Sequence, residues 1–489
     1  MRRFGAVLLV LPLIACNALR DAFSAHASDA ATAAGQSLPA ERLAGWASQV
    51  KGMPLQADNV QRLARIWVDY TLFASSLAGT RSMDDSAVIL QAMWPLVSQA
   101  KWDHFRERLV AGRTNLKTPQ VDSAYNAGSI RAFEQIQLQV PPTASPDVMA
   151  AAKKKLDGVW QQLLATKGSN FGALARKYSE DGSKNSGGYL GVFSRGRLPP
   201  PFETPAWKLA PGGMSGVIQT PYGFHIIRRP PLSEVRDSFA LGVQQGIDQA
   251  FDSTYTERLR AQRHLQIITH SLAAARAALQ DADAAENNDT KLVSYDGGAF
   301  RIKDLVRWLR ALDPQLASSV PGATDAQLTT VLQALSTRDL QLQQADSARI
   351  ALTTDDWQTV KAAYDTTLSH LETAIQVTPA LLHDSSSSPD GRAALAANHV
   401  NQYLGDVVSR RRGFMGVPPF LATVLRASAS WSLNSAGIQR ATEQAQAARV
   451  ANGGGLSGPG TGGQPSLRPA PGPAPVPGST AKPPAPGAH

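Results

Sequence analysis

The side chains whose types and spacing could do chemistry are gathered between residues 171 and 228. This stretch holds an acidic residue at Asp181, an imidazole at His225, and a dense series of glycine, proline and aromatic positions between them. Cys16 lies far outside it and is the only cysteine in the chain, so neither an intramolecular disulfide nor a cysteine-based metal cluster can form. The candidate chemistry must therefore be sought in the short motifs of residues 171–228.

Four motifs in this stretch follow one another in an order that makes them specific. They are FGALARKYS at 171–179, GGYLGVF at 187–193, PFE at 201–203 and GFHII at 223–227. Together they resemble the parvulin family of peptidyl-prolyl cis/trans isomerases, and the resemblance extends over residues 129–230. It implies a small antiparallel sheet wrapped by helices, which isomerises X-Pro peptide bonds with no cofactor and no metal.

The chemistry that the resemblance implies is rotation about an amide bond. The barrier of about 18–20 kcal/mol comes from partial double-bond character, so the site must bind the twisted amide better than the planar one. By resemblance, Asp181 occupies the family position that carries Cys or Asp, where it would face the amide oxygen and disfavour the planar state. The resemblance assigns the proline pocket to five apolar and aromatic residues: Leu190, Leu198, Phe202, Phe224 and Tyr222.

Two positions depart from the family pattern. Parvulins usually carry a histidine on the first strand, facing the histidine of the closing motif, and here that position is Gln135, facing His225. A glutamine can hold His225 in one tautomer, but it cannot share a proton as a second imidazole would. Tyr222 also stands where the family more often has a smaller residue. We therefore expect weak activity from a catalytic group of Asp181, His225 and Gln135. The alternative for His225 is a buried histidine that only orders the sheet.

The sequence pattern also predicts the elements that position these residues. Residues 135–140 alternate between polar and apolar, which predicts a strand with one buried face. The predicted order is β-α-α-β-α-β-β: a strand at 135–140, a helix that begins at Ser145-Pro146 and ends at Gly168, a helix at 171–178, a strand at 190–193, a helix from Pro201, and a hairpin at 217–228. The loop at 141–145 has no basic residue, so we expect no selectivity for phosphoserine before proline.

The regions on both sides of this domain have helical patterns. Residues 38–128 carry an apolar stripe that includes Trp67, Tyr70 and Phe73, which predicts core packing or, alternatively, a client groove. Residues 231–450 continue the helical pattern. Within them, residues 293–308 resemble the opening of the chaperone domain in SurA- and PrsA-type proteins, where a short strand and a glycine turn lead into a helix. We expect an α+β chain in which the parvulin domain is flanked by all-α chaperone-like modules.

The two ends of the sequence predict export and tethering. Residues 1–16 combine two arginines, a short apolar run and the sequence LIAC, which resembles a lipoprotein signal peptide with Cys16 as the lipidated residue. The alternative is an ordinary signal peptide with an incidental cysteine. The composition of residues 17–37 predicts a flexible tether. Residues 451–489 predict a disordered Pro/Gly-rich tail, which is either a solvated tail, a cell-wall spacer or a ligand for a proline-binding partner. By analogy with lipoprotein sorting, Asn17 favours the outer membrane.

Charge and composition narrow the function further. The formal charge is +9, but the basic residues are scattered, and the triplets at 153–155 and 410–412 are typical of solvated helix faces and ends, so no nucleic-acid partner is expected. We predict an isomerase and chaperone for unfolded or proline-containing exported and outer-membrane proteins, lipid-anchored in the cell envelope and facing the periplasm. It resembles the SurA-, PrsA- and PpiD-type folding factors. The alternatives are a non-catalytic holdase with a degenerate parvulin domain and an envelope scaffold that uses the Pro-rich tail.

Overall fold

The computed structural model describes residues 29–79, 83–111 and 116–452. The predicted signal peptide, Cys16, the first part of the predicted tether and nearly all of the predicted tail lie outside these residues. The α+β class is confirmed, and the chain divides into two compact units. The terminal unit takes its described residues from 29–102, 306–319 and 345–452, and the central unit from 103–305 and 320–344. The predicted helical modules at 38–128 and 231–450 therefore do not coincide with the units of the structure.

The terminal unit is built on a small sheet made from both ends of the described chain. Strand β1 (Asp29–Ala33) lies between β2 (Gln36–Pro39) and β10 (Trp431–Leu433), and both pairings are antiparallel. The prediction of a flexible tether is therefore wrong from Asp29 onward. Strand β1 packs closely against helix α19 (Ser435–Ala451). A Cβ on Gly437 of this helix would lie 2.1 Å from the Asp29 carbonyl oxygen, so the contact requires glycine there.

One hydrophobic core joins the N-terminal and C-terminal helices of this unit. Helix α3 (Ala57–Ala78) packs against α17 (Pro389–Val408), and Tyr70 and Tyr403 meet with their ring centroids 5.1 Å apart. Trp67 donates from Nε1 to Asn401 Oδ1 at 2.9 Å. Since Trp67, Tyr70 and Phe73 are fully buried, their stripe is core and does not form a client groove.

The terminal unit contains further helices, and some helices cross its boundary with the central unit. Helices α4 and α5 are separated at Met93, and Pro95 stands in the first turn of α5, where a proline is tolerated. The bounds are α2 Ala40–Gln49, α4 Ser86–Ala92, α5 Trp94–Val110, α12 Ile302–Ala311, α13 Pro314–Ser319, α15 Thr354–Ile375, α16 Pro379–Ser385 and α18 Pro419–Ser428.

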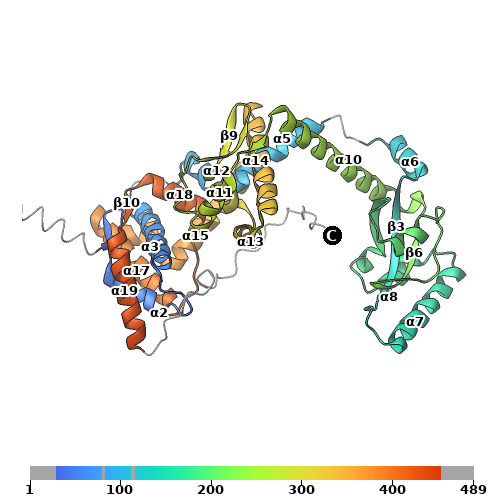
Figure 1. Ribbon diagram of the computed structural model, residues 1–489, viewed down its shortest axis with the longest axis horizontal. Helices are drawn as coiled ribbons and strands as arrows, with labels where there is room; N and C mark the ends of the chain where they lie inside the picture. The colour runs from blue at the N-terminus through green and yellow to red at the C-terminus, as the bar shows by residue number, and fades with distance from the viewer. Residues whose placement is uncertain (1–28, 80–82, 112–115, 453–489) are drawn as a thin grey trace, which may run out of the picture. The chain divides into compact units, whose positions relative to one another are not determined.

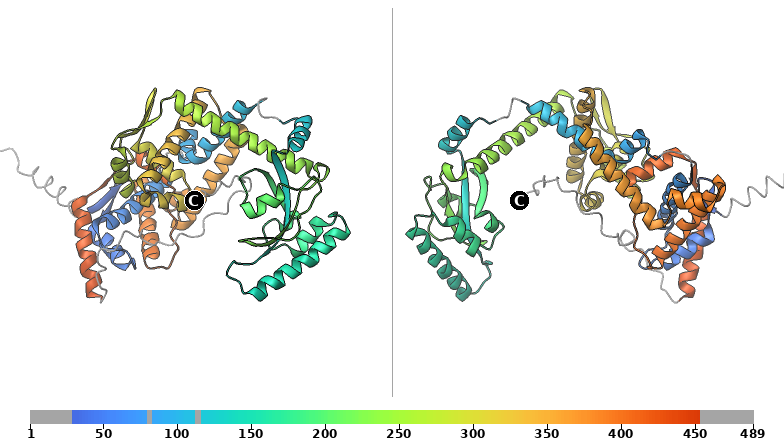
Figure 2. Two further views of the ribbon diagram at one scale, coloured as in Figure 1. Left: turned by 45° about the vertical axis from the view of Figure 1, so that its right-hand side comes forward. Right: turned by 180° about the vertical axis from the view of Figure 1, so that it is seen from behind.

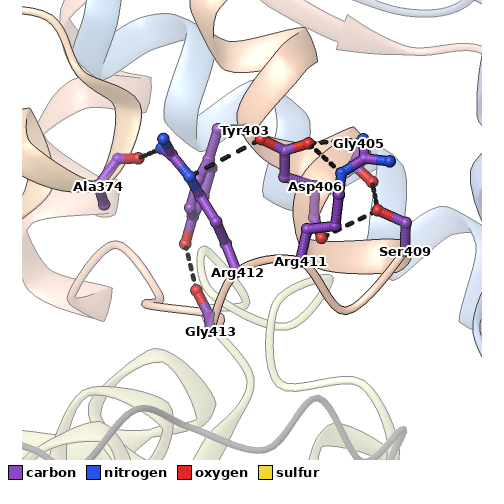
Figure 3. A network of polar contacts seen from close by, with 8 residues as sticks. All are labelled: Ala374, Tyr403, Gly405, Asp406, Ser409, Arg411, Arg412 and Gly413. Carbon is purple, nitrogen blue, oxygen red and sulfur yellow. Dashed lines mark hydrogen bonds and ion pairs between the residues drawn. The ribbon is translucent and has the colours of Figure 1, made fainter.

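The basic triplet at 410–412 is largely exposed at the end of α17, and two of its arginines also form polar contacts. Asp406, near the end of α17, accepts hydrogen bonds from Arg411 at 2.6 and 2.9 Å and pairs with Arg412 at 3.7 Å (Figure 3). Arg412 also donates to the carbonyl oxygen of Ala374 at 2.9 Å. Two of the three arginines are thus engaged in fixing the turn that follows α17.

The central unit contains the predicted domain. Its sheet has the antiparallel order β4-β3-β6-β5, with β3 at Ile130–Gln139, β4 at Tyr189–Ser194, β5 at Ile218–Thr220 and β6 at Gly223–Arg228. Helices α7 (Pro146–Ala165) and α8 (Phe171–Tyr178) pack with Ile136, Leu138, Phe224 and Ile226 on one face of the sheet (Figure 1). Helix α9 (Pro200–Ala206) packs with Phe133 and Ile227 on the other face. The predicted β-α-α-β-α-β-β order is confirmed.

The rest of the central unit extends from this sheet. Helix α6 (Thr118–Ala127) packs against the long helix α10 (Leu232–Gln262), which is kinked at Val235 near its start and is drawn in light green in Figure 2. A second sheet has the order β7-β8-β9, and its β8–β9 hairpin and glycine turn appear where the sequence indicated a strand and a turn. Its bounds and those of the neighbouring helices are β7 Gln266–Ile267, β8 Lys291–Tyr295, β9 Gly298–Arg301, α11 Ser271–Gln280 and α14 Asp325–Ser347. Among the described helices, none is both long enough and apolar enough to cross a membrane.

Candidate active site

The register of β3 and β6 brings the predicted polar residues to one face of the sheet. Gln137 lies opposite His225, and Gln135 lies opposite Ile227. Because side chains alternate along a strand, Gln135 and Gln137 share the face that carries His225, while Ile136 and Leu138 point to the core under α7. Gln135 and Gln137 are nevertheless only 7% and 8% exposed. The predicted strand with one buried face is therefore buried on both faces.

A glycine at the start of β6 makes this register possible. Gly223 has a φ of +120°, and a Cβ there would lie 2.1 Å from the Leu138 carbonyl oxygen. Only glycine tolerates both the backbone conformation and the close approach of β3. Gly223 thereby fixes the position of His225, two residues further on.

A chain of hydrogen bonds crosses the site from Asp181 to Thr220. Gln135 donates from Nε2 to Asp181 Oδ2 at 2.7 Å, and its Oε1 lies 3.0 Å from His225 Nδ1. The other imidazole nitrogen, His225 Nε2, lies 2.7 Å from Thr220 Oγ1. Thr220 Oγ1 in turn accepts from the backbone N–H of Tyr222 at 3.1 Å. Every polar atom of the Gln135 amide and the imidazole therefore has a partner.

These partners determine the tautomer of His225. An ionised Asp181 can only accept, so the Gln135 amide must present its nitrogen to Asp181 and its oxygen to His225. His225 Nδ1 therefore carries the proton, and Nε2 accepts from the Thr220 hydroxyl. The contacts of Gln135 are those that its predicted role in holding His225 in one tautomer requires.

The protonation states agree with this assignment. Burial acts to raise the pKa of Asp181, but hydrogen bonds from Ser179, Gln135 and Ser183 outweigh it and hold that pKa below its usual range. Burial lowers the pKa of His225 to about 4, and the nearby charge of Asp181 opposes this shift only in part. At neutral pH the site thus holds a carboxylate and a neutral imidazole.

The lowered pKa of His225 predicts a pH-dependent stability of the central unit. The unfolded chain takes up this proton near pH 6.5 and the folded one near pH 4, so the contribution is fully present above pH 6.5 and is lost as pH falls toward 4. From pH 7 to pH 5 the loss should be about 2 kcal/mol. Hydrogen exchange of the β3 and β6 amides at both pH values measures it.

Two variants isolate the contribution of His225. His225→Gln should remove this part of the pH dependence, whereas His264→Gln, which changes an exposed histidine of the same unit, should keep it. Equal pH dependence in the wild type and His225→Gln would contradict the assignment.

A cavity of about 380 Å³ opens over this network. Four of the five predicted pocket residues line it: Leu190, Leu198, Phe202 and Tyr222. The ring of Phe202 stands perpendicular to the His225 imidazole at a centroid distance of 5.7 Å. None of the described lining residues is Lys, Arg, Asp or Glu, so the cavity offers no charge partner to a phosphate.

Two of the predicted site residues do not line the cavity. Phe224 does not line the cavity; it is buried on the opposite face of the sheet, in the core with α7 and α8. Asp181 is also absent from the lining, because its carboxylate is engaged by Ser179, Ser183 and Gln135. These contacts hold Asp181 in place, and through its carboxylate it orients Gln135.

The sequence analysis missed five lining residues: Gln137, Gln139, Phe193, Pro199 and Thr220. The two glutamines could have been found, since they share the strand face of Gln135 by the two-residue period. Phe193 stands inside the second motif. Thr220 carries no such signal, because only the β5–β6 pairing brings its hydroxyl to His225.

The chain was compared with known proteins. A family model described as "PPIC-type PPIASE domain" matches residues 136–230. A Chaperone SurA from Polaromonas sp. is 27% identical over 231 residues, which cover 44% of this chain and 46% of that protein. A Foldase protein PrsA from Caldanaerobacter subterraneus is 33% identical over 125 residues, which cover 24% of this chain and 40% of that protein. A peptidyl-prolyl cis-trans isomerase pin1 from Schizosaccharomyces pombe is 43% identical over 76 residues, which cover 16% of this chain and 43% of that protein.

These similarities are partial and centre on one domain. The chain spans less than half the length of each of the three relatives. The family model begins within β3 and ends just before α10, so it includes all the residues of the cavity and of the hydrogen-bond chain except Gln135, which lies one position before its start. Residues 136–230 of this chain therefore belong to the PPIC-type peptidyl-prolyl cis-trans isomerases, the parvulin family that the four motifs predicted.

Proposed function

We propose that the whole chain is an exported peptidyl-prolyl isomerase and chaperone that acts on unfolded, proline-containing polypeptides of the cell envelope. The single observation that carries this proposal is the apolar cavity over the Asp181–Gln135–His225–Thr220 network. Relatives named as a chaperone and a foldase support the choice of unfolded polypeptides as clients.

The proposed catalysis needs no bond to the enzyme. Leu198 and Phe202 hold the proline ring, and the buried floor excludes water from the amide. A planar amide carries more charge on its oxygen than a twisted one, so removing water favours the twisted state. His225 and Gln135 are hydrogen-bonded to each other and to Asp181 and Thr220, so we assign them the role of holding the floor of the cavity rigid.

The first test is the isomerisation of a peptide series by the full chain. We expect turnover of Ala-Pro, Glu-Pro and phosphoserine-Pro peptides to differ by less than about fivefold, about 1 kcal/mol, because no charged side chain lines the cavity. NMR exchange spectroscopy measures the cis–trans rates without a coupled protease. A strong preference for phosphoserine would contradict the uncharged cavity. Folded protein that accelerates none of the peptides, yet suppresses client aggregation, would favour the holdase.

We also propose that Cys16 is lipidated and tethers the chain to a membrane, with the outer membrane as its site. The support is the LIAC sequence after a short apolar run, and Asn17 after it. Cys16→Ser should move the protein from the membrane fraction to the soluble envelope fraction, because this variant lacks the lipid anchor while the rest of its sequence is unchanged. Immunoblots of the separated fractions measure the shift, with Ser24→Ala as a matched control that should stay bound. Wild-type protein in the soluble fraction would overturn the proposal.

A further inference from the structure

A second and larger cavity lies next to the proline pocket within the central unit. It has a volume of about 1060 Å³ and runs between strand β4 and helix α10. Every residue of β4 lines it, together with a stripe of α10 in which Ser238, Gly242 and Gln249 recur at helical spacing. Leu190 and Phe193 line both cavities, so this β4–α10 groove continues directly from the pocket.

The backbone of β4 is suited to pairing with an extended chain. β4 is at the edge of the order β4-β3-β6-β5, and among the described strands it pairs with β3 alone. An edge strand presents unpaired N–H and C=O groups, which an extended peptide can satisfy by adding a strand. Six residues of strand correspond to roughly 20 Å of extended chain.

The helix side of the groove is kept open by a glycine that packing does not require. A Cβ on Gly242 would lie 2.6 Å from Val192 Cγ2, so close packing explains that glycine. Gly246, one turn later, has no atom within 4 Å of a built Cβ, although glycine in a helix interior destabilises the helix. Gly246 lines the groove, where a side chain would take up its space.

The lining also indicates the chemistry of the occupant. Among the described residues of the groove, Arg197 is the one charged side chain, and the others are apolar or neutral. Leu241 is 60% exposed on the wall of the groove, and Tyr222 is 64% exposed at the rim of the pocket. A path with a single charged side chain thus leads from Tyr222 through the pocket to Leu241, and its mixed apolar and neutral polar lining suits a neutral, extended polypeptide.

We propose that the β4–α10 groove binds the extended segment that flanks the isomerised proline in the same client chain, and adds it as a strand to β4. This inference rests on the proposed function, which supplies the proline in the neighbouring pocket. The two sites together would favour long unfolded segments over isolated X-Pro dipeptides, because the second contact of one chain is intramolecular.

The test is Gly246→Leu in the full chain, since the built Cβ meets nothing and leucine favours a helix. Gly158→Leu is the matched control: it makes the same change at an exposed helix-interior glycine of α7, also without neighbours. The substrates are a neutral Ala-Pro tetrapeptide and two decapeptides that extend it by six neutral residues on one side or the other.

In the wild type and Gly158→Leu, one of the two extensions should raise kcat/KM about tenfold over the tetrapeptide and tighten Kd by a similar factor. Gly246→Leu should abolish this gain and leave tetrapeptide turnover within about twofold of the wild type. If neither extension helps, or if Gly246→Leu keeps the gain, the inference is wrong.

Two further results separate the groove from the catalysis. If the wild type turns over no tetrapeptide but the decapeptide Kd still weakens in Gly246→Leu, the proposed function fails and the groove assignment stands. If sedimentation shows self-association of the wild type that Gly246→Leu abolishes, with equal Kd for long and short peptides, the groove belongs to a second copy and the inference fails.

Discussion

Replacing Phe202 by alanine should lower kcat/KM for X-Pro isomerisation by the full chain about 100-fold. Phe202 is buried, forms one wall of the cavity and stands edge-on to His225. Its loss removes the main contact with the proline ring and admits water to the amide, which together should cost about 3 kcal/mol in the transition state. NMR exchange spectroscopy on an Ala-Pro peptide measures the change.

The control for this prediction is a second buried phenylalanine on the opposite face of the sheet. Phe171→Ala creates a similar cavity in the core beside α7, away from the pocket, and should change kcat/KM by less than about threefold. Circular dichroism must show both variants folded at the assay temperature. Should they unfold, the pair Phe202→Leu and Phe171→Leu replaces them, with about a tenfold loss expected for the first. Similar losses in both members of a pair would show that stability, and not the pocket wall, sets the rate.

Removal of Asp69 should destabilise the terminal unit by about 3–5 kcal/mol. Asp69 on α3 and Arg426 on α18 form a two-pronged ion pair at 2.7 and 2.7 Å, with side chains only 13% and 8% exposed. Asp69→Ala leaves a buried guanidinium without this carboxylate, and burial makes that loss expensive. Urea unfolding, with hydrogen exchange of the α3 and α18 amides as the probe, measures the change in the free energy of unfolding.

Two comparisons make this prediction specific. Asp365→Ala breaks a half-exposed ion pair with Lys361 in the same unit and should cost less than about 1 kcal/mol. The double variant Asp69→Leu with Arg426→Met should recover most of the stability, since apolar residues fill the same space without a charge to desolvate. A loss for Asp69→Ala no larger than that for Asp365→Ala would contradict the prediction.

The isomerase domain was predictable from the sequence because local signals mark its elements. Ser145 caps α7, which begins at Pro146 as predicted, and β5 and β6 form the predicted hairpin with its turn at residues 221–222. Gln135 lies opposite Ile227 of the fourth motif, and its side chain contacts His225 at 3.0 Å. The position of Phe224 was also within reach, because neighbours on a strand face opposite ways, and His225 faces the cavity.

The terminal unit was less predictable because its defining contacts are distant in sequence. Residues 29–33 contain only small and polar side chains, so their composition resembles that of a linker. Their partner strand carries Ser432, which lies 400 positions after Thr32 and meets it at 2.8 Å between hydroxyl oxygens. No local pattern reports such a pairing. Likewise, the role of Asp181 depended on which donors reach its carboxylate, and residue type alone does not determine that.

The central position of β1 in its sheet has a consequence for biosynthesis. A chain that is made N-terminus first presents β1 and β2 long before β10, and a hairpin of two strands is marginally stable alone. Residues up to 344 suffice to complete the central unit, whereas the terminal unit waits for α19. The isomerase therefore matures first. Until the terminal unit is complete, the apolar faces of α2 and α3 lack the C-terminal helices that cover them in the folded unit.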